Sequence, residues 1–289
     1  MSDYLAILLD AIDKVASAEQ QQWLSEALAK LENSQDLDDD LLLVITRARR
    51  MVGHTLLGSE AGAISTGIGK VLIQDWEAGN TARVVLLLKA LTLQPERQEA
   101  IVTHAYQMGD EAETTALIAG IALYADDDRY KELALDSGRT NSLILFRALA
   151  TYNPYPAAYY NEAEFNQLVL KSLFLGVNTN DITGLKNRAN PELSRMCEDY
   201  YDERIAAQRS VPADIWLSVT PYASEHGLRI LSQALSSDDR DQRYYAAIAI
   251  NYYHPQDAGL QASCATQLEH EDDAQIQALL TSFIAGETR

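Results

Sequence analysis

Apolar residues recur at positions i, i+3, i+4 and i+7 in nearly every segment of the chain, and the strict alternation of half-buried strands is missing. This pattern predicts amphipathic helices throughout. Turn signals such as Gly79-Asn80, Pro95 and Gly109-Asp110 separate them. The expected helices comprise two within residues 3–32, then 41–50, 61–77, 80–92, 96–108, 110–124, 212–219, 224–236, 239–253, 257–269 and 272–285.

One apolar run, Val84 to Leu88, could form a buried strand if it stood alone. Its neighbours favour a buried helix, because a single strand would have no ladder partner. Short helices joined by tight turns predict an all-α fold of stacked antiparallel pairs, an α-solenoid of the HEAT or armadillo kind, although no strict sequence period supports the repeat. No flexible linker divides the chain, so residues 1–289 are expected to form a single domain whose motif-rich centre is 139–204.

The charge balance removes several function classes. Lys and Arg number 23 against 42 Asp and Glu, a net charge of −19, which disfavours nucleic acid as a partner. Neither a basic leader nor an apolar run of about 18 residues is present, so a cytoplasmic protein that is not integral to a membrane is expected. Cys197 and Cys264 stand far apart and predict no disulfide.

The sequence contains no complete motif for binding a metal ion or a phosphate group. The segment Gly67-Ile68-Gly69-Lys70 lacks the other residues of a phosphate loop, since Ile64 and Val71 stand where glycine and serine or threonine are needed. The five histidines show no metal-ligand spacing. We therefore expect no metal and no cofactor, and the sequence assigns no catalytic residue.

The stretch 139–204 places polar groups where helical periodicity predicts core. Asn166 falls among apolar directions of its helix, so it should be a buried amide with definite partners. Asn190-Pro191 reads as a helix N-cap, and Arg204 falls on the apolar seam of the helix that follows. Two interpretations stay open: these groups tie helices together, or they line a polar pocket for a phosphorylated or polyhydroxylated metabolite. The candidate ligand-binding residues are Arg139, Asn141, Asn153, Asn166, Lys171, Arg188, Asn190 and Arg204.

The same stretch resembles the EboA family. The resemblance is carried by Asn153-Pro154-Tyr155-Pro156, by 166–171 (NQLVLK) and by 188–193 (RANPEL), together with Tyr200 and Glu203-Arg204. It implies a helical cytoplasmic protein of secondary metabolism, encoded in a bacterial gene cluster beside a prenyltransferase and other metabolic-enzyme homologues. It assigns no catalytic residues.

Two functions are weighed on this basis. The first is an accessory or scaffold protein, or a binder of a small polar metabolite, that supports biosynthesis or export of a small, for example prenylated, metabolite; its partners would be other proteins of the cluster. The alternative is a helical enzyme that acts on a phosphorylated or prenylated molecule through Asn166, Lys171 and Arg204. A helical scaffold can assemble a site from residues far apart in sequence, so missing linear motifs leave the enzyme open.

Overall fold

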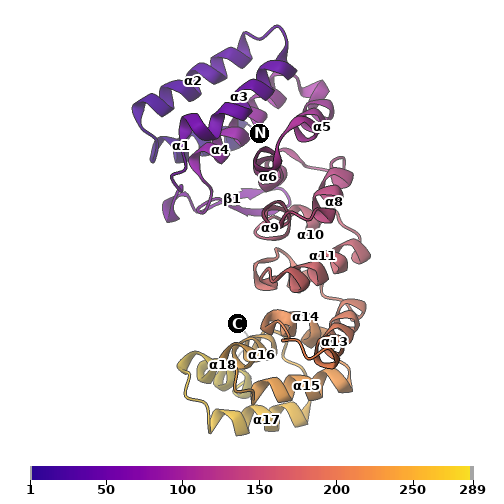
Figure 1. Cartoon of the computed structure of the whole chain (residues 1–289). Coiled ribbons are helices and arrows are strands. Elements are labelled where there is room, and N and C mark those ends of the chain that lie inside the picture. The colour runs from indigo at the N-terminus through magenta and orange to yellow at the C-terminus, as the bar shows by residue number, and fades with distance from the viewer. Residues whose placement is uncertain (1, 287–289) are drawn as a thin grey trace. The chain divides into compact units, whose positions relative to one another are not determined.

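The computed structural model describes residues 2–286 and is almost wholly helical (Figure 1). Its contacts divide the chain into an N-terminal unit, residues 1–161, and a C-terminal unit, residues 162–289. The N-terminal unit contains α1 (Ser2–Asp13), α2 (Ala18–Glu32), α3 (Leu37–Val52), η1 (Ser59–Ala61), β1 (Ala63–Thr66), β2 (Gly69–Leu72), α4 (Ala78–Leu93), η2 (Pro95–Arg97), α5 (Gln98–Met108), α6 (Glu111–Ala119), α7 (Ile121–Tyr124), α8 (Lys131–Arg139), α9 (Leu143–Ala150) and α10 (Tyr155–Tyr159).

The C-terminal unit is built in the same way from short helices. It contains α11 (Glu162–Leu175), η3 (Thr179–Asp181), α12 (Leu185–Arg188), α13 (Pro191–Ala206), η4 (Ala213–Ile215), α14 (Trp216–Val219), η5 (Thr220–Tyr222), α15 (Glu225–Leu235), α16 (Arg240–Tyr253), α17 (Ala258–Leu268) and α18 (Ala274–Ile284). The predicted all-α fold class is confirmed.

Helix α4 forms the centre of the N-terminal unit. It packs against α1, α2, α3 and α6, which surround it on several sides. The run Val84 to Leu88 is therefore buried on every face, at 0 to 1% exposure, and is helical as expected. Burial all round the helix explains why this run shows no amphipathic pattern in the sequence.

Helix α4 also carries a charge into this core. Arg83 is 3% exposed; its Nε donates to the carbonyl of Ile45 at 3.2 Å and its Nη1 to Asn80 Oδ1 at 3.1 Å. The carboxylate of Glu113 on α6, 5% exposed, lies 3.8 Å from Arg83 Nη2. Burial lowers the pKa of Arg83, opposed by the charge of Glu113. The pair joins α3, α4 and α6.

A β-hairpin stands where the sequence pattern predicted a helix over 61–77, and that prediction is wrong. Strands β1 and β2 pair antiparallel, with Ile64 opposite Val71 and Thr66 opposite Gly69. The two-residue turn Gly67-Ile68 connects them, and Thr66 Oγ1 closes it by accepting from the Ile68 amide at 3.3 Å and donating to the Gly69 carbonyl at 2.7 Å. Backbone angles of Gly62 and Gly69, at φ 58° and 144°, favour glycine and stop a helix here.

Helices of the C-terminal unit pack as successive pairs. Helix α13 contacts α14, α15 contacts α16, and α17 contacts α18, while α14, α16 and α18 also follow one another in contact (Figure 1). This is the local arrangement that an α-solenoid requires. A solenoid over the whole chain and a single domain over residues 1–289 stay predictions.

Candidate functional site

Three of the residues predicted from the sequence lie in the N-terminal unit. Arg139 and Asn141 are exposed at the turn between α8 and α9. Asn153 is 3% exposed, and its Nδ2 donates to the carbonyls of Ile118 and Ala148, both at 3.0 Å. Its Oδ1 accepts from the Tyr155 amide at 3.1 Å. Asn153 thereby fixes the start of α10, and among the described residues no hydrogen bond joins it to Arg139 or Asn141.

The structure brings two predicted residues of the C-terminal unit together. Asn166 of α11 is 1% exposed and bonds reciprocally with Asn190: Asn166 Nδ2 donates to Asn190 Oδ1 at 3.1 Å, and Asn190 Nδ2 donates to Asn166 Oδ1 at 2.9 Å. Asn190 also caps α13, accepting from the Leu193 amide at 2.8 Å, and donates to the Arg188 carbonyl at 3.0 Å. The predicted buried amide and the predicted N-cap are both confirmed.

The side chains of Lys171 and Arg188 lie on and next to α11. The Arg188 guanidinium sits over the Phe165 ring at 4.9 Å from its centroid, which adds a cation–π contact to the start of α11. Lys171 is half-buried on α11, and burial lowers its pKa. Ligand binding by these residues stays a prediction.

Arg204 occupies a more exposed position than the predicted core seam. It is half-buried in the last turn of α13, and its Nε donates to the Ser210 carbonyl at 2.8 Å. Asn190 caps the opposite end of α13, roughly 20 Å away at 1.5 Å per residue. The Arg204 guanidinium also lies over the Tyr200 ring, 5.8 Å from its centroid, so the side chain is on the face of Tyr200 but only partly covered. The buried face of α13 is formed by Leu193, Ser194, Cys197 and Glu198.

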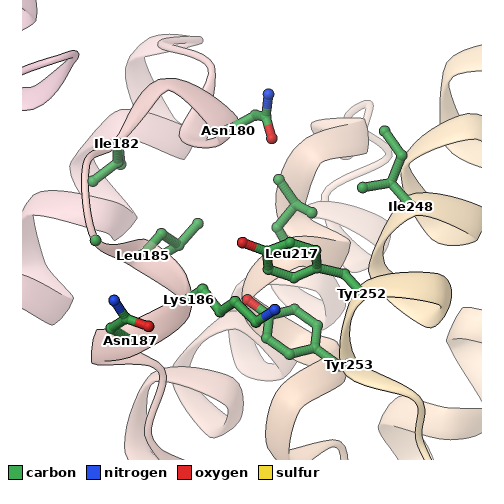
Figure 2. A pocket seen from close by; sticks show the side chains of 10 residues that line it. Asn180, Ile182, Leu185, Lys186, Asn187, Leu217, Ile248, Tyr252 and Tyr253 are labelled. Carbon is green, nitrogen blue, oxygen red and sulfur yellow. The ribbon is translucent and has the colours of Figure 1, made fainter. Parts of the chain in front are cut away.

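A pocket of about 240 Å³ opens in the C-terminal unit beside the segment that the amides fix (Figure 2). One wall is the chain between α11 and α13, and the other is formed by α14 and α16. Figure 2 shows Lys186 reaching from the first wall towards the tyrosines of the second. The lining residues are Asn180, Ile182, Gly184, Leu185, Lys186, Asn187, Leu217, Ile248, Tyr252 and Tyr253.

Hydrogen bonds hold the first wall in place. The Asn178 amide donates to the Tyr245 hydroxyl of α16 at 2.8 Å. The backbone amide of Thr179 donates to Asp214 Oδ2 at 2.7 Å, and its hydroxyl donates to the Asp214 carbonyl at 3.1 Å. The Asn166–Asn190 pair anchors the other end of the segment. A pocket between walls joined in this way is formed before a ligand arrives, which lowers the entropy cost of binding.

Lys186 provides the positive charge of the pocket. Its Nζ lies 3.6 Å from the centroid of the Tyr252 ring, and within residues 2–286 it makes no ion pair. No acidic residue is among those that line the pocket, although the chain carries 42 acids. The side-chain amides of Asn180 and Asn187 make no hydrogen bond to another described residue. Burial raises the pKa of the Tyr253 phenol, so this hydroxyl stays protonated and can donate.

These groups suit recognition of a small polar molecule. An ammonium, two amides and two phenols can bind carboxylate, phosphate or hydroxyl groups, while Ile182, Leu185 and Leu217 offer an apolar surface. Among the described residues, no group of three or more His, Cys, Asp and Glu side chains is arranged to hold a metal ion.

The sequence pattern gave little reason to select Lys186 or Asn187. Both precede the motif 188–193 in a short connection next to Gly184, and connecting loops often carry binding groups. Tyr252 and Tyr253 lie at the end of a predicted helix, where the sequence pattern indicated no role for them. Only tertiary packing brings the two segments together.

Comparison with known proteins identifies a family for most of the chain. The family model described as metabolite traffic protein EboA matches residues 4–220, a range that includes the first wall of the pocket and Leu217 but stops before α16. No curated protein and no solved structure matches the chain. Within the described residues, no helix has both the length and the apolar character needed to cross a membrane.

Proposed function

Because the chain belongs to the EboA family of metabolite traffic proteins, we propose that its C-terminal unit binds a small metabolite in the pocket around Lys186. The observation that supports this proposal most strongly is that no acidic residue lines the pocket that contains the Lys186 ammonium, although the chain has a net charge of −19. The ligand then presents an anionic or strongly polar group to Lys186 and its remaining surface to Leu185 and Leu217. No chemical step is part of the proposal.

The energies favour reversible binding. Leaving the exposed Tyr252 ring costs the Lys186 ammonium about 0.5–1 kcal/mol of cation–π stabilisation. An ion pair at an exposed lysine contributes about 0–1 kcal/mol, so exchanging the ring for an anion changes the free energy by only a small margin. A small margin of this kind fits a protein that takes up and releases its ligand.

The wider role that we propose is support of the biosynthesis or export of a small, for example prenylated, metabolite made by the products of an ebo-type gene cluster. Binding of a partner enzyme of the cluster is a separate role that the same protein could fill as a scaffold. The family description supports metabolite traffic in general terms, and the pocket supports a ligand-binding role within it.

Native mass spectrometry of protein freshly purified from its own cells tests the pocket. We expect a small-molecule adduct on the wild type that is lost in Lys186→Met, because methionine keeps the apolar stem and removes the ammonium. Lys186 is exposed, so the variant should fold. Lys70→Met removes the same charge from the exposed face of β2 and should keep the adduct.

A second lysine variant separates this pocket from the residues predicted by sequence. Only Lys171 and Lys186 occur in residues 162–289. If Lys171→Met loses the adduct while Lys186→Met keeps it, the ligand binds at the sequence-predicted set and the proposal is wrong. A wild-type chain that carries only another protein would favour the scaffold.

A further inference from the structure

The β-hairpin of the N-terminal unit closes a second pocket, of about 390 Å³. The hairpin tip Gly67-Ile68 forms one side, and Tyr4 of α1 with Gln98 at the start of α5 forms another. The floor is the run from Ala122 to Asp126, which contains the end of α7 and the first residue of the acidic loop. The glycine segment, which matched no phosphate-loop motif, therefore meets Asp126, the first residue of the acidic run Asp126-Asp127-Asp128, at one cavity.

Backbone carbonyl groups on the floor make no hydrogen bond within residues 2–286. The carbonyl of Ile121 accepts from the Ala125 amide at 2.9 Å, which completes the single turn of α7. The carbonyls of Ala122, Leu123 and Tyr124 accept no hydrogen bond from any residue that the structure describes, although all three residues are at most 5% exposed. Buried carbonyls without a donor are costly, and the end of a helix concentrates partial negative charge.

The Asp126 carboxylate adds a full negative charge at the rim. Its side chain is 94% exposed and lies 4.0 Å from Arg129 Nη2, a long ion pair. The Arg129 guanidinium instead binds Asp127, with Nε at 2.7 and 2.9 Å from the two carboxylate oxygens. No basic residue is among those that line the pocket, and Tyr4 and Tyr124 are among the lining residues.

We propose that this pocket binds a small organic cation, a primary ammonium compound with a short apolar body. The ammonium would donate to the backbone carbonyls at the end of α7 and pair with Asp126, and the apolar body would lie against Ile68 and Tyr4. An aromatic face such as that of Tyr4 attracts cations as well, and no basic residue in the lining opposes them. The site is independent of the Lys186 pocket, because no residue lines both.

Titration of the full ¹⁵N-labelled chain by NMR tests the charge preference with three probes of similar size. n-Butylammonium chloride should shift the amide resonances of residues 67–68 and 122–126 in a saturable way. 1-Butanol should bind at least tenfold more weakly, and sodium butyrate should leave these resonances unshifted. Equal affinity for n-butylammonium and 1-butanol, or n-butylammonium shifts confined to other residues, would overturn the proposal.

Two aspartate variants complete the experiment. Asp126→Asn should weaken n-butylammonium binding at least fivefold. Asp128→Asn is the matched control, since this carboxylate is also exposed but does not line the pocket, and it should bind as the wild type does. Both residues are exposed, so neither change should unfold the chain. Unchanged affinity in Asp126→Asn would overturn the role of the carboxylate and with it the proposed cation site.

Discussion

Asn166 and Asn190 together satisfy polar groups that would otherwise be buried without partners. Each amide donates to the other, and Asn190 in addition holds the Leu193 amide and the Arg188 carbonyl. The pair thus fixes the start of α13 and the segment that leads into it, including Lys186 and Asn187. These two buried amides therefore hold in place the segment that forms one wall of the Lys186 pocket.

The two single substitutions should together lower the free energy of unfolding by more than the double substitution does. Asn166→Ala leaves the Asn190 amide buried and unpaired, so the free energy of unfolding should fall by about 1–3 kcal/mol in urea denaturation. The double variant with Asn190→Ala should be less destabilised than the sum of the single changes. Asn187→Ala, at an exposed amide, is the control and should change stability little. Strict additivity in the cycle would contradict the coupling.

Among the elements, the β-hairpin is the departure from an otherwise helical chain. Gly69 has φ 144°, and a Cβ built on it would lie 2.7 Å from Cβ of Pro154. Glycine is therefore required at this position for two reasons: its backbone conformation and the close approach of β2 to the Asn153-Pro154 segment. Pro154 belongs to the motif-rich centre 139–204, so this contact connects the hairpin to that centre.

Substitution of Gly69 tests this contact. Gly69→Ala should lower the free energy of unfolding by about 1–3 kcal/mol, because alanine meets both the strained φ and Pro154. Gly67→Ala is a matched control in the same turn: no atom lies within 4 Å of its added Cβ. Thermal unfolding followed by circular dichroism measures both variants. Similar melting temperatures for the two would show that β2 does not pack tightly on Pro154.

For the whole molecule, a net charge of −19 coexists with arginine–carboxylate pairs at helix junctions. In the C-terminal unit, Arg243 of α16 binds Glu271 ahead of α18, with Nε to Oε2 at 2.8 Å and Nη2 to Oε1 at 3.2 Å. The hydrogen bonds from Arg243 lower the pKa of Glu271 from its usual 4.5. The stabilisation is therefore fully present above pH 4.5 and is lost as pH falls through the lower folded-state pKa.

Glu271→Gln should expose this dependence. At pH 7 the variant should be less stable than the wild type by about 1–3 kcal/mol, since it loses a buried hydrogen-bonded charge. The difference should shrink in urea unfolding below the folded-state pKa of Glu271, where the wild-type carboxyl is itself protonated. Glu269→Gln, at an exposed acid two residues earlier, should show no such change. A difference that is constant with pH would contradict the pair's contribution.

Most of the helices could be predicted from local pattern, because helical periodicity and capping depend on neighbouring residues. The helix at 84–88, the cap at Asn190 and the buried amide Asn166 could all be read from neighbouring residues. The hairpin was missed because its signal, glycines flanking a two-residue turn, occupied a segment also compatible with helical spacing. Arg204 is only half-buried, which the sequence did not indicate, because periodicity gives the direction of a side chain but not how far neighbouring elements cover it.

The positions of the pockets follow from long-range packing alone. Lys186 and Tyr252 are far apart in sequence and meet because α16 packs beside the segment that precedes α13. Gly67 and Asp126 likewise share a cavity through the packing of the hairpin near α7. A pocket depends on gaps between elements, which are set by how helices of different lengths fit together. Local periodicity therefore determined the parts of this protein, and long-range packing determined which of their side chains could act together.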